Sequence, residues 1–182
     1  MSVFHGNRLR ELRKNKKLSI AELSKLSDVS TGLISQIERE MVIPSVVSIW
    51  RLAQALGTNI NYFFDDEAED KVLIRKNEHH TVILHGGSSF YKLLSSSAPD
   101  HLLDMTEITL KSGYAYEQPS LTHDGEECGY VLKGELTVLL NDKTYVLHEG
   151  DSIYFNSTLP HKYIKHSDED CVSIWAMTPA FF

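Results

Sequence analysis

The chain of 182 residues has an ordinary globular composition, with 42% hydrophobic and 24% charged residues. This composition excludes a disordered tail, a collagen-like repeat and a coiled-coil rod. The sequence has no run of about 18 or more apolar residues, so no membrane span is predicted. Its amino-terminal segment is basic and polar without the apolar core of a secretion signal, and we therefore expect a cytoplasmic protein.

The net charge of −7 is divided unevenly along the chain. Residues 1–62 carry nine Lys or Arg against five Asp or Glu, a local charge of +4. Residues 63–182 carry nine against twenty, a local charge of −11. Such an asymmetry between the halves of a chain indicates two functions, and it leaves the basic half open to binding nucleic acid.

Residues 1–64 have helical periodicity and are predicted to fold as a bundle of five helices. Ser19 is a good helix cap, and Glu22 three residues later completes a capping box. Gly57 is placed to end the fourth helix, and residues 59–64 are expected to add the last helical turn. This half of the chain is therefore predicted to be a small all-helical domain.

An acidic, apolar-poor stretch at residues 65–70 is expected to be a linker, and beyond it the apolar period changes to two. Short strands separated by turn residues are predicted at residues 71–75, 81–84, 90–94, 105–110, 129–133, 136–140, 143–147, 152–155 and 171–177. Strands of this number and spacing are typical of a β-sandwich or barrel. We therefore expect an α + β two-domain protein, with a helical domain at 1–64 and a barrel domain at 71–182.

Residues 19–39 contain two short predicted helices around a four-residue turn. The small residues Ala21 and Ser24 can lie beneath the second helix, whose amino-terminal polar side chains then project outward. This segment resembles the helix-turn-helix of the phage-repressor-like (XRE) regulators, and the resemblance extends over residues 7–62. It implies that the second helix enters the major groove of double-stranded DNA. The alternative is a structural bundle with a solvated basic face.

By the pattern of this family, the groove-facing positions of the second helix are Thr31, Gly32, Ser35 and Gln36. A glutamine can bond an adenine edge through two hydrogen bonds, while a glycine allows close approach of the backbone. The residues placed to contact phosphates are Ser30, Arg39, Arg10, Arg13, Lys14 and Lys17. Many members carry Gln where this chain has Ile20, and no contact is expected there. Repressors of this kind read two half-sites of an operator, so we expect a homodimer.

Two blocks in the strand half resemble the paired motifs of the cupin family, which are β-barrels of the jelly-roll type. In the first block, Glu127 is followed after six residues by Gly134, and in the second His161 comes eleven residues after Gly150. In metal-binding cupins, two His in a His-x-His motif, this Glu and the later His point into the barrel. His123, Glu127 and His161 match these positions, whereas Leu121 replaces the first His.

Three interpretations of His123, Glu127 and His161 remain open. Two His and one carboxylate can hold a divalent metal such as Zn, Fe, Mn or Ni and leave coordination positions open. The same side chains can instead hydrogen-bond a small-molecule effector without metal, with Tyr116 and Gln118 as walls of the pocket. They can also be inert buried polar groups.

The two cysteines, Cys128 and Cys171, are too few for a disulfide framework and are expected to be free thiols. On a regular strand Cys128 faces opposite to Glu127, so we do not expect it to be a ligand.

The order of a repressor-like DNA reader followed by a cupin resembles a known arrangement of bacterial transcription regulators. It implies a regulator whose cupin domain senses a small metabolite or a metal and thereby changes operator binding. Effectors of such relatives include polyamines, amino acids and sulfur compounds, and the sequence does not select among them. The alternative is a cupin metalloenzyme, similar to non-haem iron oxygenases, that carries an accessory DNA-binding domain.

Overall fold

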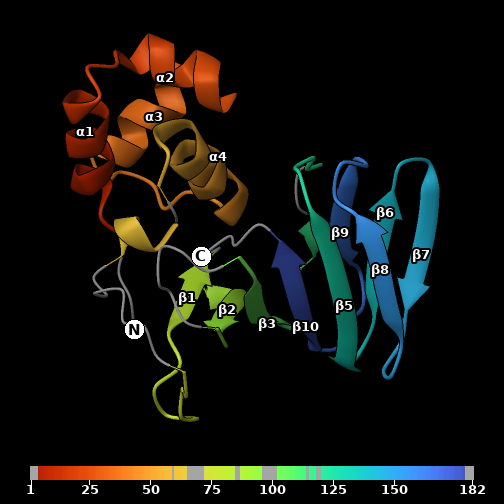
Figure 1. Cartoon of the computed structure of the whole chain (residues 1–182). Coiled ribbons are helices and arrows are strands. Elements are labelled where there is room, and N and C mark those ends of the chain that lie inside the picture. The colour runs from red at the N-terminus through yellow and green to blue at the C-terminus, as the bar shows by residue number, and fades with distance from the viewer. Residues whose placement is uncertain are drawn as a thin grey trace. The chain divides into compact units, whose positions relative to one another are not determined.

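A computed structural model of the chain describes residues 4–58, 60–64, 72–84, 87–95, 102–113, 115–117 and 120–178, apart from the side chains of Asn61 and Leu84. The chain divides into two compact units, one helical and one rich in strands (Figure 1). The predicted linker at 65–70 lies outside the described residues, so the domain boundaries at 64 and 71 stay a prediction. No helix in these described ranges is long and apolar enough to cross a membrane.

The helical unit contains, within its described residues, four α-helices: α1 (Gly6–Asn15), α2 (Ile20–Ser27), α3 (Thr31–Glu38) and α4 (Val46–Leu56). A serine caps the amino terminus of α2, α3 and α4, where its hydroxyl accepts a backbone hydrogen bond from three residues later. The predicted capping box of Ser19 and Glu22 is confirmed. The turn between α2 and α3 comprises three residues rather than four, and it begins with Asp28 in the left-handed conformation.

The prediction of a fifth helix is wrong. Residues 60–63 form only a short 3-10 turn, η1 (Ile60–Phe63). Gly57 adopts the left-handed conformation, with φ of 59°, and so ends the helical path before this segment. The following Phe64 pairs with Phe4 in an antiparallel bridge, and both Phe63 and Phe64 are buried. The extended backbone that this bridge requires stops η1 from growing into an α-helix.

A buried ion pair that the sequence did not reveal joins α1 to α3. The guanidinium of Arg13 makes two hydrogen bonds to the Glu38 carboxylate, of 2.5 and 2.8 Å, and a third of 2.7 Å to the carbonyl oxygen of Leu18. The two side chains belong to residues that are only 8% and 7% exposed. The prediction that Arg13 contacts a phosphate is therefore wrong, because its guanidinium is buried and hydrogen-bonded to Glu38 and Leu18.

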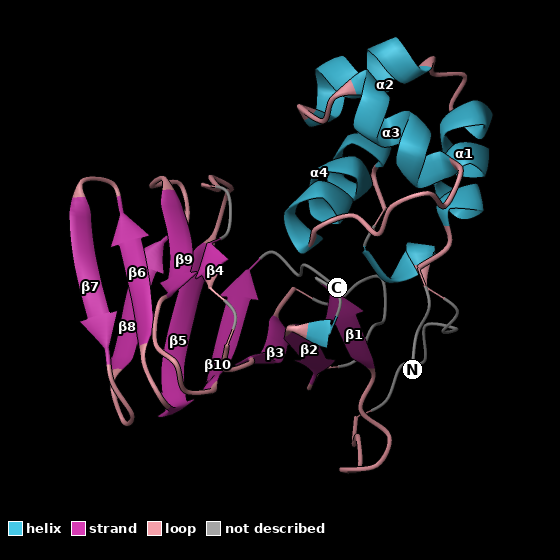
Figure 2. Cartoon of the chain, turned by 180° about the vertical axis from the view of Figure 1, so that it is seen from behind, coloured by secondary structure: helices cyan, strands magenta, loops and turns pink. Residues whose placement is uncertain are grey.

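The strand unit consists of two antiparallel sheets stacked face to face, the architecture of a jelly roll. The first sheet has six strands in the order β1-β2-β3-β10-β5-β8, and the second has four in the order β4-β9-β6-β7. Strands β5 and β8 of the first sheet face the viewer in Figure 1. Figure 2 shows the opposite side, where β6 and β9 of the second sheet face the viewer. The strands are β1 (Thr81–Leu84), β2 (Ser89–Leu93), β3 (Asp104–Leu110), β4 (Tyr116–Glu117), β5 (Glu126–Lys133), β6 (Leu136–Leu140), β7 (Lys143–Leu147), β8 (Ser152–Asn156), β9 (His161–Lys165) and β10 (Cys171–Thr178).

The predicted strands from residue 81 onward are confirmed with small shifts of their ends, but the one predicted at 71–75 is not. Residues 72–75 have no regular structure, and Val72 and Leu73 are exposed at 105% and 58%. This apolar run therefore covers no core. The sequence reasoning missed β4 and β9. In β9 the alternation is hidden because the buried positions are His161, Tyr163 and Lys165, which are all polar residue types.

We expect Arg13→Ala to destabilise the helical unit by about 3–5 kcal/mol, because it leaves the Glu38 carboxylate buried without its partner. The matched control is Arg10→Ala, since Arg10 is exposed on the same helix. Denaturant unfolding of the full chain, followed by circular dichroism at the helical signal, measures both. Equal stabilities of the two variants would contradict the structural role of Arg13.

Candidate functional site

The amino-terminal end of α3 presents small and polar residues to solvent. Thr31, Gly32 and Gln36 are exposed and Ser35 is half-buried, whereas Ile34 on the other side of the helix is 0% exposed. A Cβ atom added at Gly32 would meet nothing within 4 Å. Three of the four residues predicted to face a DNA groove therefore lie on the solvent-exposed side of the helix. The helix backbone is accessible there at Gly32.

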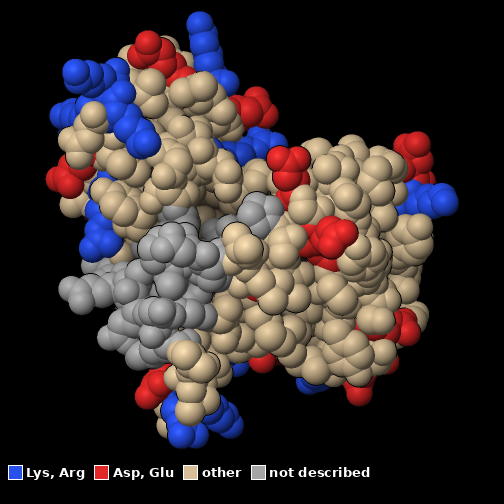
Figure 3. Space-filling view, viewed as in Figure 1, with Lys and Arg blue, Asp and Glu red and all other residues tan. Residues whose placement is uncertain are grey.

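Basic side chains flank this helix. Arg39, which follows α3, is exposed and donates a hydrogen bond of 3.0 Å to the carbonyl of Ser35. Ser30 caps α3 by accepting from the Leu33 N–H at 3.2 Å, and its hydroxyl proton can still be donated. The three remaining basic residues of the predicted cluster are all exposed, and Figure 3 shows Lys and Arg gathered on the helical unit. They are Arg10, Lys14 and Lys17.

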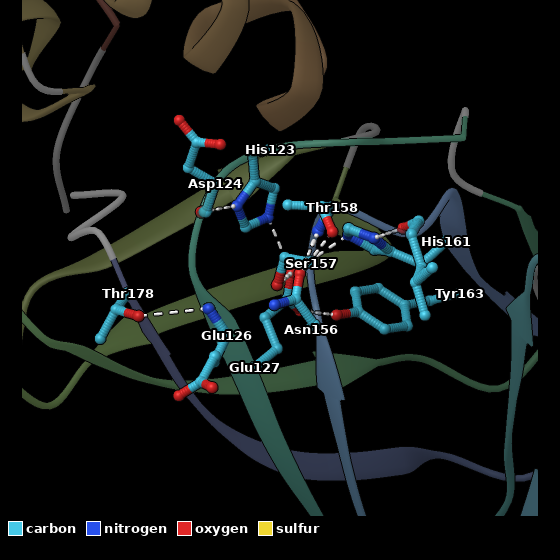
Figure 4. A network of polar contacts seen from close by, with 11 residues as sticks. His123, Asp124, Glu126, Glu127, Asn156, Ser157, Thr158, His161, Tyr163 and Thr178 are labelled. Atoms are coloured by element: carbon cyan, nitrogen blue, oxygen red, sulfur yellow. Dashed lines mark hydrogen bonds and ion pairs between the residues drawn. The ribbon is translucent and has the colours of Figure 1, made fainter.

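The three side chains predicted as metal ligands meet in the strand unit. His123 comes from the loop before β5, Glu127 from β5 and His161 from the start of β9 (Figure 4). The Nε2 atoms of His123 and His161 lie 2.8 and 3.1 Å from the same oxygen, Oε1 of Glu127. All three residues are buried. Their potential ligand atoms lie within 4.8 Å of one another, and among the described residues this is the cluster of side chains that could hold a metal ion.

Backbone carbonyls determine how both histidines face the carboxylate. The Nδ1 atom of His123 lies 2.9 Å from the carbonyl oxygen of Asp124, and that of His161 lies 2.8 Å from the carbonyl oxygen of Leu159. A carbonyl oxygen only accepts, so each Nδ1 carries the proton and, in a neutral ring, each Nε2 holds a lone pair. The Nε2 atom of His161 is buried and makes no hydrogen bond of acceptable geometry. Two imidazole Nε2 atoms and a carboxylate therefore converge, and either a proton on Nε2 or a bound cation supplies the positive charge between them.

Ser157 and Tyr163 also contact Glu127, and the sequence reasoning missed both. The Tyr163 hydroxyl donates to Oε2 of Glu127, and the Ser157 hydroxyl lies 3.3 Å from Oε1. The Ser157 backbone in addition accepts from the N–H of His123 at 2.9 Å and so fixes the loop that carries this ligand. The alternation of His161 and Tyr163 on one strand could have revealed Tyr163. Nothing in the sequence marks Ser157.

The electrostatics of the trio follow from burial and hydrogen bonding. Burial raises the pKa of the Glu127 carboxyl, but its contacts with His123 and His161 outweigh burial and lower the pKa to about 2. Burial lowers the pKa of the His123 ring, but its hydrogen bonds to Glu127 and to the Asp124 carbonyl, together with the negative charges of Glu127 and Asp124, outweigh burial, so the net pKa is raised. Burial raises the pKa of Tyr163 well above its usual range, so its hydroxyl remains a donor. The site holds an ionised carboxylate that stabilises positive charge.

The predicted pocket walls are in part described. Tyr116 lies on β4, and its hydroxyl is 2.9 Å from that of Tyr91 on β2. Burial raises the pKa of both tyrosines, so they are neutral hydrogen-bonding groups. Gln118 lies outside the described residues. Leu121, at the position where the family has its first His, is 5% exposed and pairs with His161 in an antiparallel bridge. One side of the site is therefore apolar.

Glu127 and Cys128 point to opposite faces of β5, as the strand alternation predicts. Glu127 is 3% exposed, whereas Cys128 is exposed and free. Cys171 on β10 is also a free thiol and is buried.

These features define a helix-turn-helix module followed by a cupin barrel, and comparisons with known proteins agree. A helix-turn-helix family model matches residues 9–63, and a cupin domain family model matches residues 106–177. The crystal structure of an HTH_3 family transcriptional regulator from Vibrio cholerae has a TM-score of 0.72 and 24% identity, covering 95% of this chain and 93% of that one.

Curated relatives extend the similarity to nearly the whole chain. The HTH-type transcriptional regulator PuuR of Escherichia coli (strain K12) is 31% identical over 180 residues, which cover 97% of this chain and 96% of the relative. The HTH-type transcriptional regulator SutR of the same organism is 21% identical over 163 residues, or 90% and 88% of the two chains. The chain belongs to the HTH-type transcriptional regulators and is a DNA-binding regulator with a cupin domain.

In metal-free protein, we expect the contribution of the trio to stability to be largest between about pH 4.5 and 6.5. The lowered pKa of Glu127 gives stability that is present above 4.5 and lost as pH falls toward 2, and the raised pKa of His123 gives stability that is present below 6.5 and lost as pH rises through the folded value. The measurement is the Tm difference between the wild type and Glu127→Gln across this range, after chelation.

The control for this measurement is Glu126→Gln, which alters the exposed neighbour on the same strand. A difference between the wild type and Glu127→Gln that does not vary with pH would show that the trio carries no charge interaction.

Proposed function

We propose that the regulator reads its operator with the exposed side of α3, through Thr31, Gly32, Ser35 and Gln36. The support is the exposure of Thr31, Gly32 and Gln36, together with exposed basic residues of the same unit that are suited to phosphates. The phosphate contacts in this proposal come from Ser30, Arg39, Arg10, Lys14 and Lys17. Because one recognition helix reads few base pairs, the active form is a homodimer on two half-sites, and it acts in the cytoplasm.

The barrel is proposed to sense an effector at His123, Glu127 and His161. The observation that carries this proposal is the convergence of two imidazole Nε2 atoms on one ionised carboxylate, with each Nδ1 held by a backbone carbonyl. Metal-binding histidines use their second nitrogen in this way, so the residues fit a divalent cation. When bound, the cation supplies positive charge and open coordination positions for an effector. The effector changes operator affinity by as much as it binds two dimer states differently.

Catalysis is not part of this proposal. Two histidines and a carboxylate are also the ligand set of non-haem iron oxygenases, so the donor set alone does not separate the two functions. The curated relatives PuuR and SutR, which match 97% and 90% of this chain, are regulators, and a DNA reader gives an oxygenase no obvious benefit. Oxygen uptake by the iron-loaded protein with a small substrate would reverse this assignment.

We expect Gln36→Ala to cost about 1–3 kcal/mol in binding to the operator and to relax preference at one base pair, because a bidentate contact to a base edge is lost. Lys14→Ala is the comparison, since loss of a phosphate contact weakens binding to all sequences alike. Fluorescence anisotropy with selected and scrambled duplexes measures both variants. Equal losses of Gln36→Ala on the two duplexes would contradict its role as a base reader.

Gly32→Ala tests the close approach of the backbone to DNA. The added methyl group enters open space, and alanine favours helix by up to about 1 kcal/mol over glycine, so the stability of the free protein stays equal or rises. Operator affinity falls, because the methyl group separates the helix from the groove. Unchanged affinity in a variant of unchanged stability would remove Gly32 from the interface.

Loading with Zn²⁺ or Mn²⁺ tests the barrel site. We expect one ion per chain by isothermal titration calorimetry, and we expect Glu127→Gln and His161→Gln each to weaken binding by at least about 10-fold, as loss of even a supporting contact does. Glu126→Gln is the control and keeps wild-type affinity. Absence of binding by the wild type would leave a metal-free effector pocket or inert buried groups as the explanation.

A further inference from the structure

The outer face of the six-stranded sheet carries apolar side chains where a solvated face would carry polar ones. The register places Met105, Ala176, Cys128 and Tyr154 in one row across β3, β10, β5 and β8. In the next row Ile174 is paired with Tyr130. Val172 and Leu132 continue the surface toward the other end of β10 and β5. We call these eight residues the outer-face patch.

Members of the outer-face patch are open to solvent in the chain. Tyr154 is 64% exposed, Tyr130 46%, Leu132 41% and Met105 40%. Single exposed apolar residues are normal on a soluble protein, but a contiguous set across four strands marks an interaction surface. Tyrosine and methionine are also enriched in the centres of protein interfaces. Figure 3 shows a mostly uncharged surface over these strands.

The outer-face patch has few charged residues at its border, although residues 63–182 carry a net −11. Glu107 is paired with Lys92 on the adjacent strand at 2.5 Å, and Glu126 accepts a 2.5 Å hydrogen bond from the Tyr154 hydroxyl. The outer-face patch therefore lacks the concentrated charge that would attract a strongly acidic or strongly basic partner. A face with so few charges presents little like-charge repulsion to an identical face, which favours a second copy of this chain.

The face that carries the outer-face patch approaches the size of a dimer interface. Four strands spaced about 4.8 Å apart, each of five to eight residues at about 3.4 Å rise, give a face of roughly 450 Å² in projection. A standard interface buries about 800 Å² of accessible surface on each partner, and side-chain relief makes accessible area larger than its projection.

We propose that the outer-face patch of β3, β10, β5 and β8 is the homodimer interface, in which the same face of a second copy covers it. This inference rests on the dimeric DNA reader of the proposed function and assigns the surface that joins the two copies. A two-fold arrangement uses the same residues from both copies, so one substitution acts twice in the dimer.

The test is the dimer dissociation constant of the full chain, measured by sedimentation equilibrium from nanomolar to micromolar concentration. We expect the wild type to be a dimer and Tyr154→Arg to raise the dissociation constant by about 30-fold or more, because an interface tyrosine is replaced by a charge that the second copy repeats. Val146→Arg is the matched control, because Val146 is 49% exposed on β7 of the other sheet. It should dimerise like the wild type. Thermal unfolding confirms that both variants fold.

Alkylation of cysteine gives a second readout that does not depend on the arginine variants. Cys128 lies within the outer-face patch and Cys171 is buried, so labelling by iodoacetamide reports on Cys128. In the wild type its labelling rate should fall as protein concentration rises through the dissociation constant, and in Tyr154→Arg it should stay high.

A monomeric wild type, or a Tyr154→Arg variant that dimerises as tightly as the wild type, overturns the proposed interface. A labelling rate of Cys128 that is independent of concentration overturns it as well. So does a monomeric protein in which Tyr154→Arg lowers only the unfolding temperature, since the face then packs against another part of the same chain. Failure of the dimeric wild type to bind DNA would instead overturn the proposed function and leave the interface in place.

Discussion

The alternation of side chains along β5 is the constraint on which the described features of the strand unit depend. Because successive residues of a strand face opposite sides of a sheet, Glu127 lies inside and Cys128 outside. The inward set supplies the carboxylate that both histidines face, and Gly129, whose missing side chain leaves room for the Trp175 ring. The outward set supplies much of the apolar surface of the sheet. A slip of one residue in the pairing of β5 would exchange the two sets and remove both features.

Local features of the helical unit were predictable from the sequence, and a distant one was not. The serine caps and Gly57 act through hydrogen bonds within a few residues, so their signals are contiguous in the chain. The bond between Arg13 and Glu38 joins residues 25 positions apart. A basic residue that is buried by such a partner has the same appearance in sequence as one that contacts a phosphate.

The strand unit shows the same division between pattern and packing. His123, Glu127 and His161 could be identified because their spacing resembles a family motif. Ser157 contacts Glu127 through a turn that brings it back beside the ligand loop, and no local pattern encodes this contact. The strand predicted at 71–75 failed for the opposite reason, since Val72 and Leu73 belong to an apolar run typical of a strand but have no core to cover. Periodicity describes what a segment can bury, and only the rest of the fold supplies something to bury it against.

The carbonyls of Asp124 and Leu159 have a consequence for how such a site diverges in evolution. Every amino acid has a backbone carbonyl, so the orientation of each imidazole does not depend on which side chain occupies position 124 or 159. Related proteins are therefore free to vary the rim of the barrel, and with it the molecules admitted, while the inner polar centre keeps its protonation pattern. At positions 124 and 159 the side chains belong to the rim that selects the molecules admitted, whereas the backbone carbonyls fix the protonation of the histidines. Mutation can therefore alter selectivity without altering which nitrogen of each histidine carries the proton.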